Sequence, residues 1–376
     1  MILESLAIRH FRNIESLDWQ PHPRANLLLG LNAQGKTNLL EAIFLLGTTK
    51  SLRQAGDGEM IADGQAQALV KGQVFREEAG ASRSLEVLLS RQERKTVRLN
   101  DKNLARFSEI FGHLSVVLFT PEDLQLVKAG PQARRFYLDL EISQASPQYL
   151  HSLQVFERAL KQRNSALKMQ AEGRAGRGTA QAFEQNLVQA GSEVVLFRLK
   201  AVEELEPLAA RVQERISGGT EKLGLSYLSS LSGGEEALPR DLDGLADRYR
   251  RRLKEASAEE EARATTLVGP HRDDIRMTVN GRPARAFASQ GQQRTAALAL
   301  KLAEVEFLKS RLGENPVLLL DDVLSELDGP RQRELLGLLD EKVQTFVTST
   351  HAEDLPFKPG QVLQARKGSF APPSAA

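Results

Sequence analysis

Residues 30–37 constrain this chain most strongly, because they read GLNAQGKT and match the pattern G-x-x-x-x-G-K-[ST] in full. An apolar run at 24–29 precedes the motif and predicts a buried strand. Helical spacing follows from Thr37 and stops at Gly47. A glycine-rich turn with a lysine can match by chance, but the flanking strand and helix argue against that alternative. The motif therefore predicts a phosphate-binding loop in an α/β fold.

In such a loop, backbone N–H groups surround the phosphates, and the helix N-terminus adds partial positive charge. Lys36 is expected to reach the β- and γ-phosphates, and the Thr37 hydroxyl to take a Mg²⁺ position. The predicted nucleotide-binding residues are Gly30, Leu31, Asn32, Ala33, Gln34, Gly35, Lys36, Thr37 and Asn38.

A second nucleotide motif lies near the other end of the chain, where residues 317–322 read VLLLDD. Apolar residues followed by an acid are typical of a Walker-B strand, in which Asp321 serves Mg²⁺ and Asp322 polarises the attacking water. Alone this signal is weak, because any buried strand that ends in Asp-Asp matches it. Together with GLNAQGKT it predicts ATP and Mg²⁺ as cofactors.

Composition narrows the remaining classes of protein. The chain has no Cys, which excludes disulfide scaffolds, iron–sulfur clusters, Cys-ligated zinc and thiol catalysis. No apolar stretch approaches the ~18 residues of a membrane span, and MILESLAIRHFRN does not read as a signal peptide, so we expect a cytoplasmic protein without a membrane partner. The net charge of +1 restricts any argument for DNA binding to local basic runs, at 91–106, 158–177 and 248–254. Each run can equally be a solvated face.

Three further segments indicate which kind of P-loop protein this is. SQGQQR at 289–294 precedes a long amphipathic helix, SELD at 325–328 follows the Walker-B acids, and His351 follows the strand candidate TFVTST. In this order they resemble the signature, D-loop and switch histidine of an ABC-type ATPase head. LSGGE at 231–235 is closer to a transporter signature, but Pro239 and acids follow it, so we interpret it as a loop.

The resemblance then narrows to one family. PEDLQLVKAGPQARRFYLD (121–139), GPHRDDI (269–275), LLLDDVLSELDGPRQREL (318–335) and the opening LAIRHFRNIESL are similar to RecF proteins, which belong to the SMC-like ABC ATPases. The similarity runs from residue 1 to about 351. It implies an α/β ABC-type head built from both ends of the chain, 1–120 and 285–376, with 366–376 expected to be disordered. It also implies a mostly helical insertion at 121–284, called lobe II.

The resemblance also implies roles for single residues. Asp322 would be the catalytic base, Asp328 the D-loop acid and His351 the γ-phosphate sensor, with Thr37 and Asp321 at the metal. Arg12 and Asn13 would touch the nucleotide from the first strand. Four residues would act across an ATP-dependent homodimer: Ser289, Gly291, Gln292 and Arg294.

The function implied by the resemblance is DNA replication and repair. Such a protein binds single-stranded and linear or gapped double-stranded DNA through phosphates, and acts with RecO and RecR to promote RecA loading at gaps and SOS induction. Its slow, DNA-stimulated ATP hydrolysis serves as a conformational switch. The alternatives are an SMC-like head that links DNA structurally and the motor subunit of an ABC transporter.

Some positions stay open from the sequence. An Asp at 322, where transporters usually have Glu, reaches less far and indicates a slow ATPase. The Q-loop residue is unassigned among Glu122, Asp123 and Gln125. Arg134-Arg135 can be a solvated face, an ion pair with Asp139, a nucleotide sensor or a DNA contact, and residues 271–274 an interface cluster or a polar loop.

Overall fold

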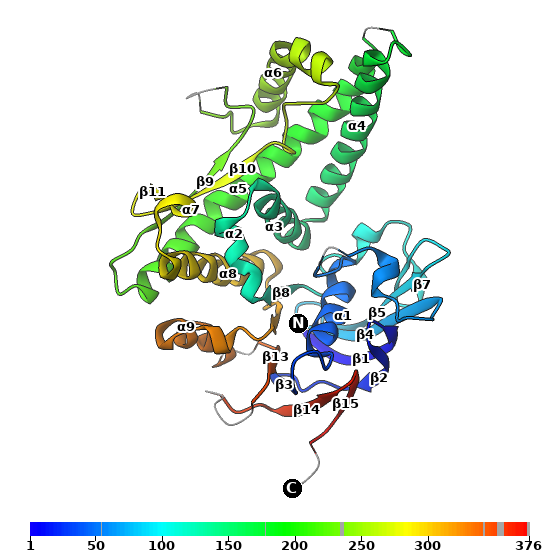
Figure 1. Ribbon diagram of the computed structural model, residues 1–376, viewed down its shortest axis with the longest axis vertical. Helices are drawn as coiled ribbons and strands as arrows, with labels where there is room; N and C mark the ends of the chain where they lie inside the picture. The colour runs from blue at the N-terminus through cyan, green and yellow to red at the C-terminus, as the bar shows by residue number, and fades with distance from the viewer. Residues whose placement is uncertain (54, 177, 234–236, 341–342, 352–356, 374–376) are drawn as a thin grey trace. The chain divides into compact units, whose positions relative to one another are not determined.

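The computed structural model describes residues 1–376 except 54, 177, 234–236, 341–342, 352–356 and 374–376 (Figure 1). The chain divides into two compact units. The head unit comprises Met1–Leu124, Arg215–Gly218 and Ala297–Ala376, and the inserted unit comprises Gln125–Glu214 and Gly219–Ala296. The second boundary falls at 296 rather than at the predicted 285, so SQGQQR belongs to the inserted unit.

The head unit contains an antiparallel sheet of order β2-β1-β4-β5-β6-β7. Buried and partly buried residues alternate along β4, as expected of a sheet with one face on the core. The strands are β1 Ile2–Phe11, β2 Ile14–Trp19, β4 Gln67–Arg76, β5 Ala81–Ser90, β6 Thr96–Leu99 and β7 Lys102–Asn103.

The second sheet of the head unit has the order β15-β14-β3-β13-β12-β8 and is parallel except for β15. Helix α1, Lys36–Thr48, contacts strands of both sheets, and its apolar residues are buried on nearly all sides. The parallel pairing brings the carboxyl ends of β3 and β12 to one edge of the sheet. The strands are β3 Ala25–Leu29, β8 Val116–Phe119, β12 Val317–Leu320, β13 Thr345–Ser349, β14 Gln361–Arg366 and β15 Ser369–Ala371.

The C-terminal segment corrects one prediction, because residues 369–371 are not disordered but form β15 against β14. The turn between these strands lies on the phosphate-binding loop. Lys367 N–H donates to Gln34 Oε1 at 2.7 Å, and Gly368 N–H donates to Gln34 O at 2.9 Å. Backbone hydrogen bonds to the head unit therefore fix a segment whose Pro-rich composition indicated disorder.

The inserted unit is mostly helical, as predicted, and also holds a three-stranded antiparallel sheet of order β11-β10-β9 that the sequence pattern did not reveal. Its strands are β9 Leu223–Leu228, β10 Asp274–Val279 and β11 Arg282–Pro283. Its helices are α2 Gln125–Lys128, α3 Pro131–Ala145, α4 Pro147–Ala171, α5 Glu184–Ile216, α6 Leu242–Arg263 and α7 Ala284–Phe287, and α8 Gln290–Leu312 begins in it.

The remaining helices are short or lie near the C-terminus. They are α9 Gly329–Asp340 and the 3₁₀ helices η1 Asp57–Met60, η2 Phe107–Ile110, η3 Pro121–Leu124, η4 Thr179–Phe183 and η5 Leu324–Glu326. Within the described part of the chain, every helix is too short or too polar to cross a bilayer.

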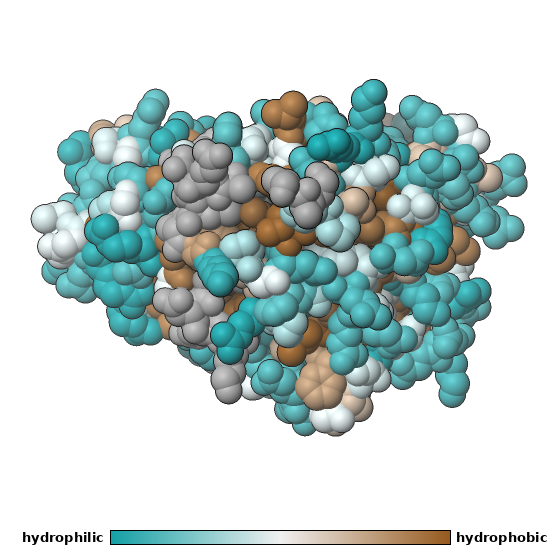
Figure 2. Space-filling model, turned by 90° about the horizontal axis from the view of Figure 1, so that it is seen from below, coloured by the Kyte–Doolittle hydropathy of each residue, from teal (hydrophilic) through white to brown (hydrophobic). Residues whose placement is uncertain are grey.

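Hydrophilic side chains cover most of the face shown in Figure 2, and apolar residues form small groups between them. Exposed large apolar side chains in the described residues include Leu31, which is 71% exposed on the phosphate-binding loop, and Phe287 at the end of α7. The apolar residues of α1 and β12, by contrast, are buried in the head unit.

Candidate nucleotide site

The GLNAQGKT loop leaves β3 at its carboxyl end and enters α1, as the motif predicted. Gly35 stands at the helix N-cap with a φ of 105°, in the left-handed region that favours glycine. A Cβ at this position would lie 2.8 Å from Asn13 Oδ1. The left-handed φ and the close approach of the Asn13 side chain therefore both favour glycine at this position.

Lys36 folds back over the loop. Its Nζ donates to Gly30 O at 2.7 Å and to Leu31 O at 3.1 Å. The residue is only 4% exposed, although its ammonium group is charged. The loop carbonyls hold this ammonium group at the mouth of the loop, where an incoming phosphate can replace them as its partner.

The Walker-B acid Asp321 meets the phosphate-binding loop directly. Thr37 Oγ1 donates to Asp321 Oδ1 at 3.0 Å, and the Thr348 hydroxyl from β13 lies 3.0 Å from the same oxygen. Burial raises the pKa of Asp321 above its ordinary value, against the two hydroxyl hydrogen bonds that lower it. A desolvated carboxylate beside a threonine hydroxyl supplies the hard oxygen atoms that Mg²⁺ prefers.

Asp322, the predicted base, lies at the edge of the same pocket. Its φ is 49°, which is uncommon for a residue with a Cβ, and its N–H donates to Thr348 Oγ1 at 2.8 Å. The pocket has a volume of about 410 Å³ and is lined by Asn13, Asn32, Ala33, Gly35, Lys36, Thr37, Asn38, Arg53 and Asp322. The structure therefore brings the loop, Asn13 and the second Walker-B acid around one cavity.

Arg12 and Asn13 come from the β1–β2 turn and behave differently from each other. Asn13 Oδ1 accepts from Asn38 Nδ2 at 2.8 Å beside the loop. Arg12 donates to both oxygens of Glu41 on α1, each at 2.9 Å, and it borders a neighbouring pocket of about 590 Å³. Arg12 is thus held by a fully buried carboxylate, a partner that sequence reasoning did not identify.

Two more residues of the site could not be predicted from the sequence. Arg53 lines both pockets, although its segment carries no recognised motif. Thr348 bridges the two Walker-B acids, at 3.0 Å from Asp321 Oδ1 and 3.2 Å from Asp322 Oδ1. Only the pairing of β12 with β13 reveals this contact.

The predicted D-loop acid and switch histidine lie outside the set of residues that line the 410 Å³ pocket. Asp328 caps α9, because its Oδ1 accepts from Arg331 N–H at 3.3 Å. His351 is exposed, and its Nδ1 lies 2.8 Å from Thr350 Oγ1. It follows Ser349 by two residues, and the carbonyl of Ser349 accepts from Gly30 N–H. Their roles toward a nucleotide stay predictions.

The signature segment forms the N-terminus of α8. Ser289 N–H donates to Gln292 Oε1 at 2.9 Å, and Gln292 N–H donates to Ser289 Oγ at 3.2 Å, which is a capping box. Ser289, Gly291 and Arg294 are exposed. A capped and exposed helix end of this length is a suitable site for an anion.

Three ambiguous segments have defined contacts in the structure. Arg134 is buried and pairs with Asp274, whereas Asp139 pairs with Arg198. Of the alternatives left open for Arg134, the solvated face and the ion pair with Asp139 are therefore wrong. Asp123 accepts from Thr120 N–H at 2.9 Å, and burial raises its pKa to about 6. It is thus engaged in its own loop, and the Q-loop assignment stays open among Glu122, Asp123 and Gln125.

The LSGGE segment lies in a loop after β9 as far as the structure describes it. Leu231 is buried, and Ser230 N–H donates to Asp273 Oδ1 at 2.7 Å. Gly234 and Glu235 lie outside the described residues. In the basic run 158–177, Arg163 is buried in a polar network and therefore does not face solvent.

Comparisons with known proteins agree with this geometry. The family described as RecF/RecN/SMC N terminal domain matches residues 2–358. DNA replication and repair protein RecF of Symbiobacterium thermophilum is 44% identical over 355 residues, which cover 94% of this chain and 93% of that protein. RecF of Bacillus subtilis is 39% identical over 356 residues, 94% of this chain and 95% of that protein.

Solved structures give the same result for the fold. The recombination mediator protein RecF-ATP in the RecFOR pathway superimposes with a TM-score of 0.92 and 34% identity, over 99% of this chain and 98% of that one. An Smc head domain from Pyrococcus furiosus superimposes with a TM-score of 0.55 at 16% identity, over 98% and 95%, which supports the fold alone. The head unit has the fold of an ABC-type ATPase.

Proposed function

Because this chain belongs to the RecF family of DNA replication and repair proteins, we propose that it is an ATP-dependent switch that binds DNA as a dimer. The observation that carries the proposal is the contact between Thr37 and Asp321, which joins the phosphate-binding loop to the Walker-B strand beside a pocket of about 410 Å³. ATP is the nucleotide we assign to this pocket, since a solved RecF-ATP structure matches 99% of the chain.

The residues at the pocket fit a magnesium ion. Thr37 Oγ1 and Asp321 Oδ1 are 3.0 Å apart, and Asp321 is desolvated and has a raised pKa, so a nearby cation would favour its charged form. When bound, Mg²⁺ would neutralise charge on the β- and γ-phosphates. Thr37 and Asp321 would hold it.

The chain's own groups then have separate tasks in hydrolysis. Lys36 transfers its ammonium hydrogen bonds from the loop carbonyls to the phosphates. Asp322 accepts a proton from the attacking water while Thr348 keeps its carboxylate in place. The short side chain of Asp322 supports slow turnover. His351 would respond to the γ-phosphate, and Asp328 to the partner subunit.

The signature residues act in trans in this proposal. Ser289, Gly291 and Arg294 are exposed at the N-terminus of α8, with Gln292 completing the cap. The N-terminal charge of a 23-residue helix suits the γ-phosphate bound by a second copy. Dimerisation would therefore depend on ATP.

DNA would be bound through phosphates, both single-stranded and linear or gapped double-stranded. The run 91–106 exposes Arg94, Lys102 and Arg106, which suit such contacts. Binding is therefore expected to weaken steeply as salt rises, because phosphate contacts release counterions. Acting in the cytoplasm with RecO and RecR, the dimer would promote RecA loading and SOS induction, with DNA stimulating weak ATP hydrolysis.

The test is the solution mass of the protein with and without Mg²⁺-ATP, beside a Ser289→Arg variant. We expect a monomer that becomes a dimer only with ATP, and a variant that binds ATP but stays monomeric. A wild type that stays monomeric with ATP is measured again with linear duplex added. A monomer in that run as well, or a variant that dimerises normally, would refute the role of SQGQQR.

A further inference from the structure

Two segments whose roles stay open from the sequence, Arg134-Arg135 and residues 271–274, meet inside the inserted unit. Arg134 Nε and Nη2 donate to the two carboxylate oxygens of Asp274 at 2.7 and 2.8 Å. Arg134 is 6% exposed. A buried, bidentate arginine–carboxylate pair fixes the relative orientation of its partners as well as their distance.

The third nitrogen of the same guanidinium has partners on another element. Arg134 Nη1 donates to Leu126 O at 3.2 Å and to Ala129 O at 2.8 Å, at the C-terminal end of α2. All three nitrogens are therefore engaged within the unit, which argues against a nucleotide or DNA phosphate as the partner. One side chain joins the end of α2 to the first residue of β10.

Helix α7 packs on both of these elements, α2 and β10. It leads directly into the signature segment, and a buried residue of that segment bonds back to it. Gln293 Nε2 donates to Ala284 O at 3.2 Å and to Arg285 O at 3.3 Å. A continuous set of contacts thus runs from Arg134, through α2 and β10, to α7 and the first turn of α8.

We propose that Arg134 is a positioning residue for the signature segment. It holds α2 and β10 as a fixed support for α7, and so it fixes the end of α8 at Ser289 before a nucleotide and a second copy arrive. This inference rests on the proposed function of SQGQQR. An interface that needs one helix end in one place gains affinity when that end is ordered in advance. The planar fork of arginine is required, because lysine makes no bidentate pair.

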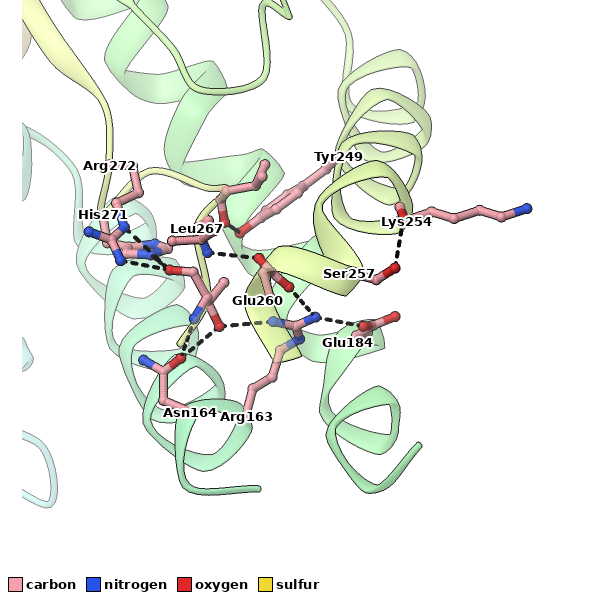
Figure 3. A network of polar contacts seen from close by, with 12 residues as sticks. Arg163, Asn164, Glu184, Tyr249, Lys254, Ser257, Glu260, Leu267, His271 and Arg272 are labelled. Atoms are coloured by element: carbon pink, nitrogen blue, oxygen red, sulfur yellow. Dashed lines mark hydrogen bonds and ion pairs between the residues drawn. The ribbon is translucent and has the colours of Figure 1, made fainter. Parts of the chain in front are cut away.

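The chain offers a matched control in the same unit. Arg163 is also buried, and its Nη2 lies 2.7 Å from Glu260 and 2.9 Å from Glu184 (Figure 3). Its Nη1 donates to Thr266 Oγ1 at 2.9 Å. These contacts join α4, α5 and α6 rather than α2 and β10. Arg163→Lys therefore removes a guanidinium that is equally buried and ion-paired, without touching the support of α7.

The first measurement is hydrogen exchange of the full, nucleotide-free chain in wild type, Arg134→Lys and Arg163→Lys. We expect amides of residues 284–294 to exchange about tenfold faster in Arg134→Lys, because the variant weakens the contacts that oppose local opening of this segment. In Arg163→Lys these amides should exchange as in wild type, while exchange rises near Glu260. If residues 284–294 respond equally in both variants, the inference is wrong.

The second measurement is dimer mass as a function of protein concentration with Mg²⁺-ATP. Arg134→Lys should bind ATP as monomer with unchanged affinity and dimerise about tenfold more weakly, whereas Arg163→Lys should dimerise like wild type. Faster exchange with wild-type dimerisation would also refute a positioning role. Failure of the proposed function would show separately. A Ser289→Arg variant that dimerises would refute the role of SQGQQR, while the exchange result for Arg134→Lys would stay as it is.

A variant that does not fold is replaced by Asp274→Asn. The amide keeps the shape of the carboxylate and removes the charge-assisted pair, and the same exchange and mass measurements apply, with the same outcomes supporting or refuting the proposal.

Discussion

The turn between β14 and β15 provides the sharpest test of how the phosphate-binding loop is held. Gly368 has a φ of 83°, and a Cβ at this position would lie 1.8 Å from the carbonyl oxygen of Asn13. This neighbour is backbone, so it cannot rotate away. Gly368→Ala must therefore move the turn off the loop.

The size of the effect follows from what the turn loses. A left-handed conformation costs a residue with a Cβ about 1–2 kcal/mol. Displacement also removes the hydrogen bonds from Lys367 N–H and Gly368 N–H to Gln34, each worth about 1 kcal/mol. We expect a loss of about 3–4 kcal/mol, which lowers the Tm of a unit of about 200 residues by roughly 6–16 °C.

The assay is thermal unfolding together with titration by a fluorescent ATP analogue. Gly80→Ala is the matched control, because Gly80 has a φ of 59° and no atom within 4 Å of its added Cβ. Gly80→Ala adds backbone strain without a steric clash. Its Tm should therefore fall by only about 2–4 °C per kcal/mol of strain, and its ATP affinity should stay unchanged. Gly368→Ala should also weaken ATP binding, because Gln34 belongs to the loop. Equal melting and equal ATP affinity in the two variants would show that the turn does not support the loop.

Three further predictions concern single side chains of the head unit. Thr348→Val leaves the Asp322 N–H without its acceptor, so stability should fall by about 1–3 kcal/mol and single-turnover hydrolysis should fall more than ATP affinity. Arg12→Ala should cost about 3–5 kcal/mol in denaturant unfolding by leaving the buried Glu41 unpaired, and adding Glu41→Gln should restore most of it; no recovery would contradict this. The pKa of Asp123 is raised to about 6 by burial, so the folded state holds this proton between about pH 4 and 6 and the contribution of Asp123 to stability falls as pH rises through that window. The difference in Tm between Asp123→Asn and wild type should therefore shift in favour of the variant when pH is raised from about 4 to about 7.5. A difference that does not change with pH would refute the assignment.

The nucleotide loop and the Walker-B strand could be predicted from the sequence because their chemistry is local. GLNAQGKT needs only its own strand and helix, and β12 is a continuous apolar run that ends in two acids. Arg12 shows where local reasoning fails. Its partner Glu41 stands inside the apolar segment NLLEAIFLL, and only the folded turn places the two side chains together.

The sequence pattern also missed strands that depend on distant partners. β10 carries charged residues and pairs with β9 about fifty residues earlier, beyond the reach of periodicity. A solvated helix face was one of the alternatives that the sequence left open for Arg134. Its burial is explained by Asp274, which is 140 residues away.

The position of β3 in its sheet has a consequence for biosynthesis. β3 pairs on one side with β13 and on the other with β14, so both neighbours of the strand that carries the phosphate-binding loop are translated after the whole inserted unit. At the usual rate of about 5–20 residues per second, the nascent strand waits tens of seconds for them. A chain stopped before residue 361 contains the complete GLNAQGKT motif and still leaves one edge of β3 open. Both strand partners of β3 are therefore present only after β14 has been synthesised.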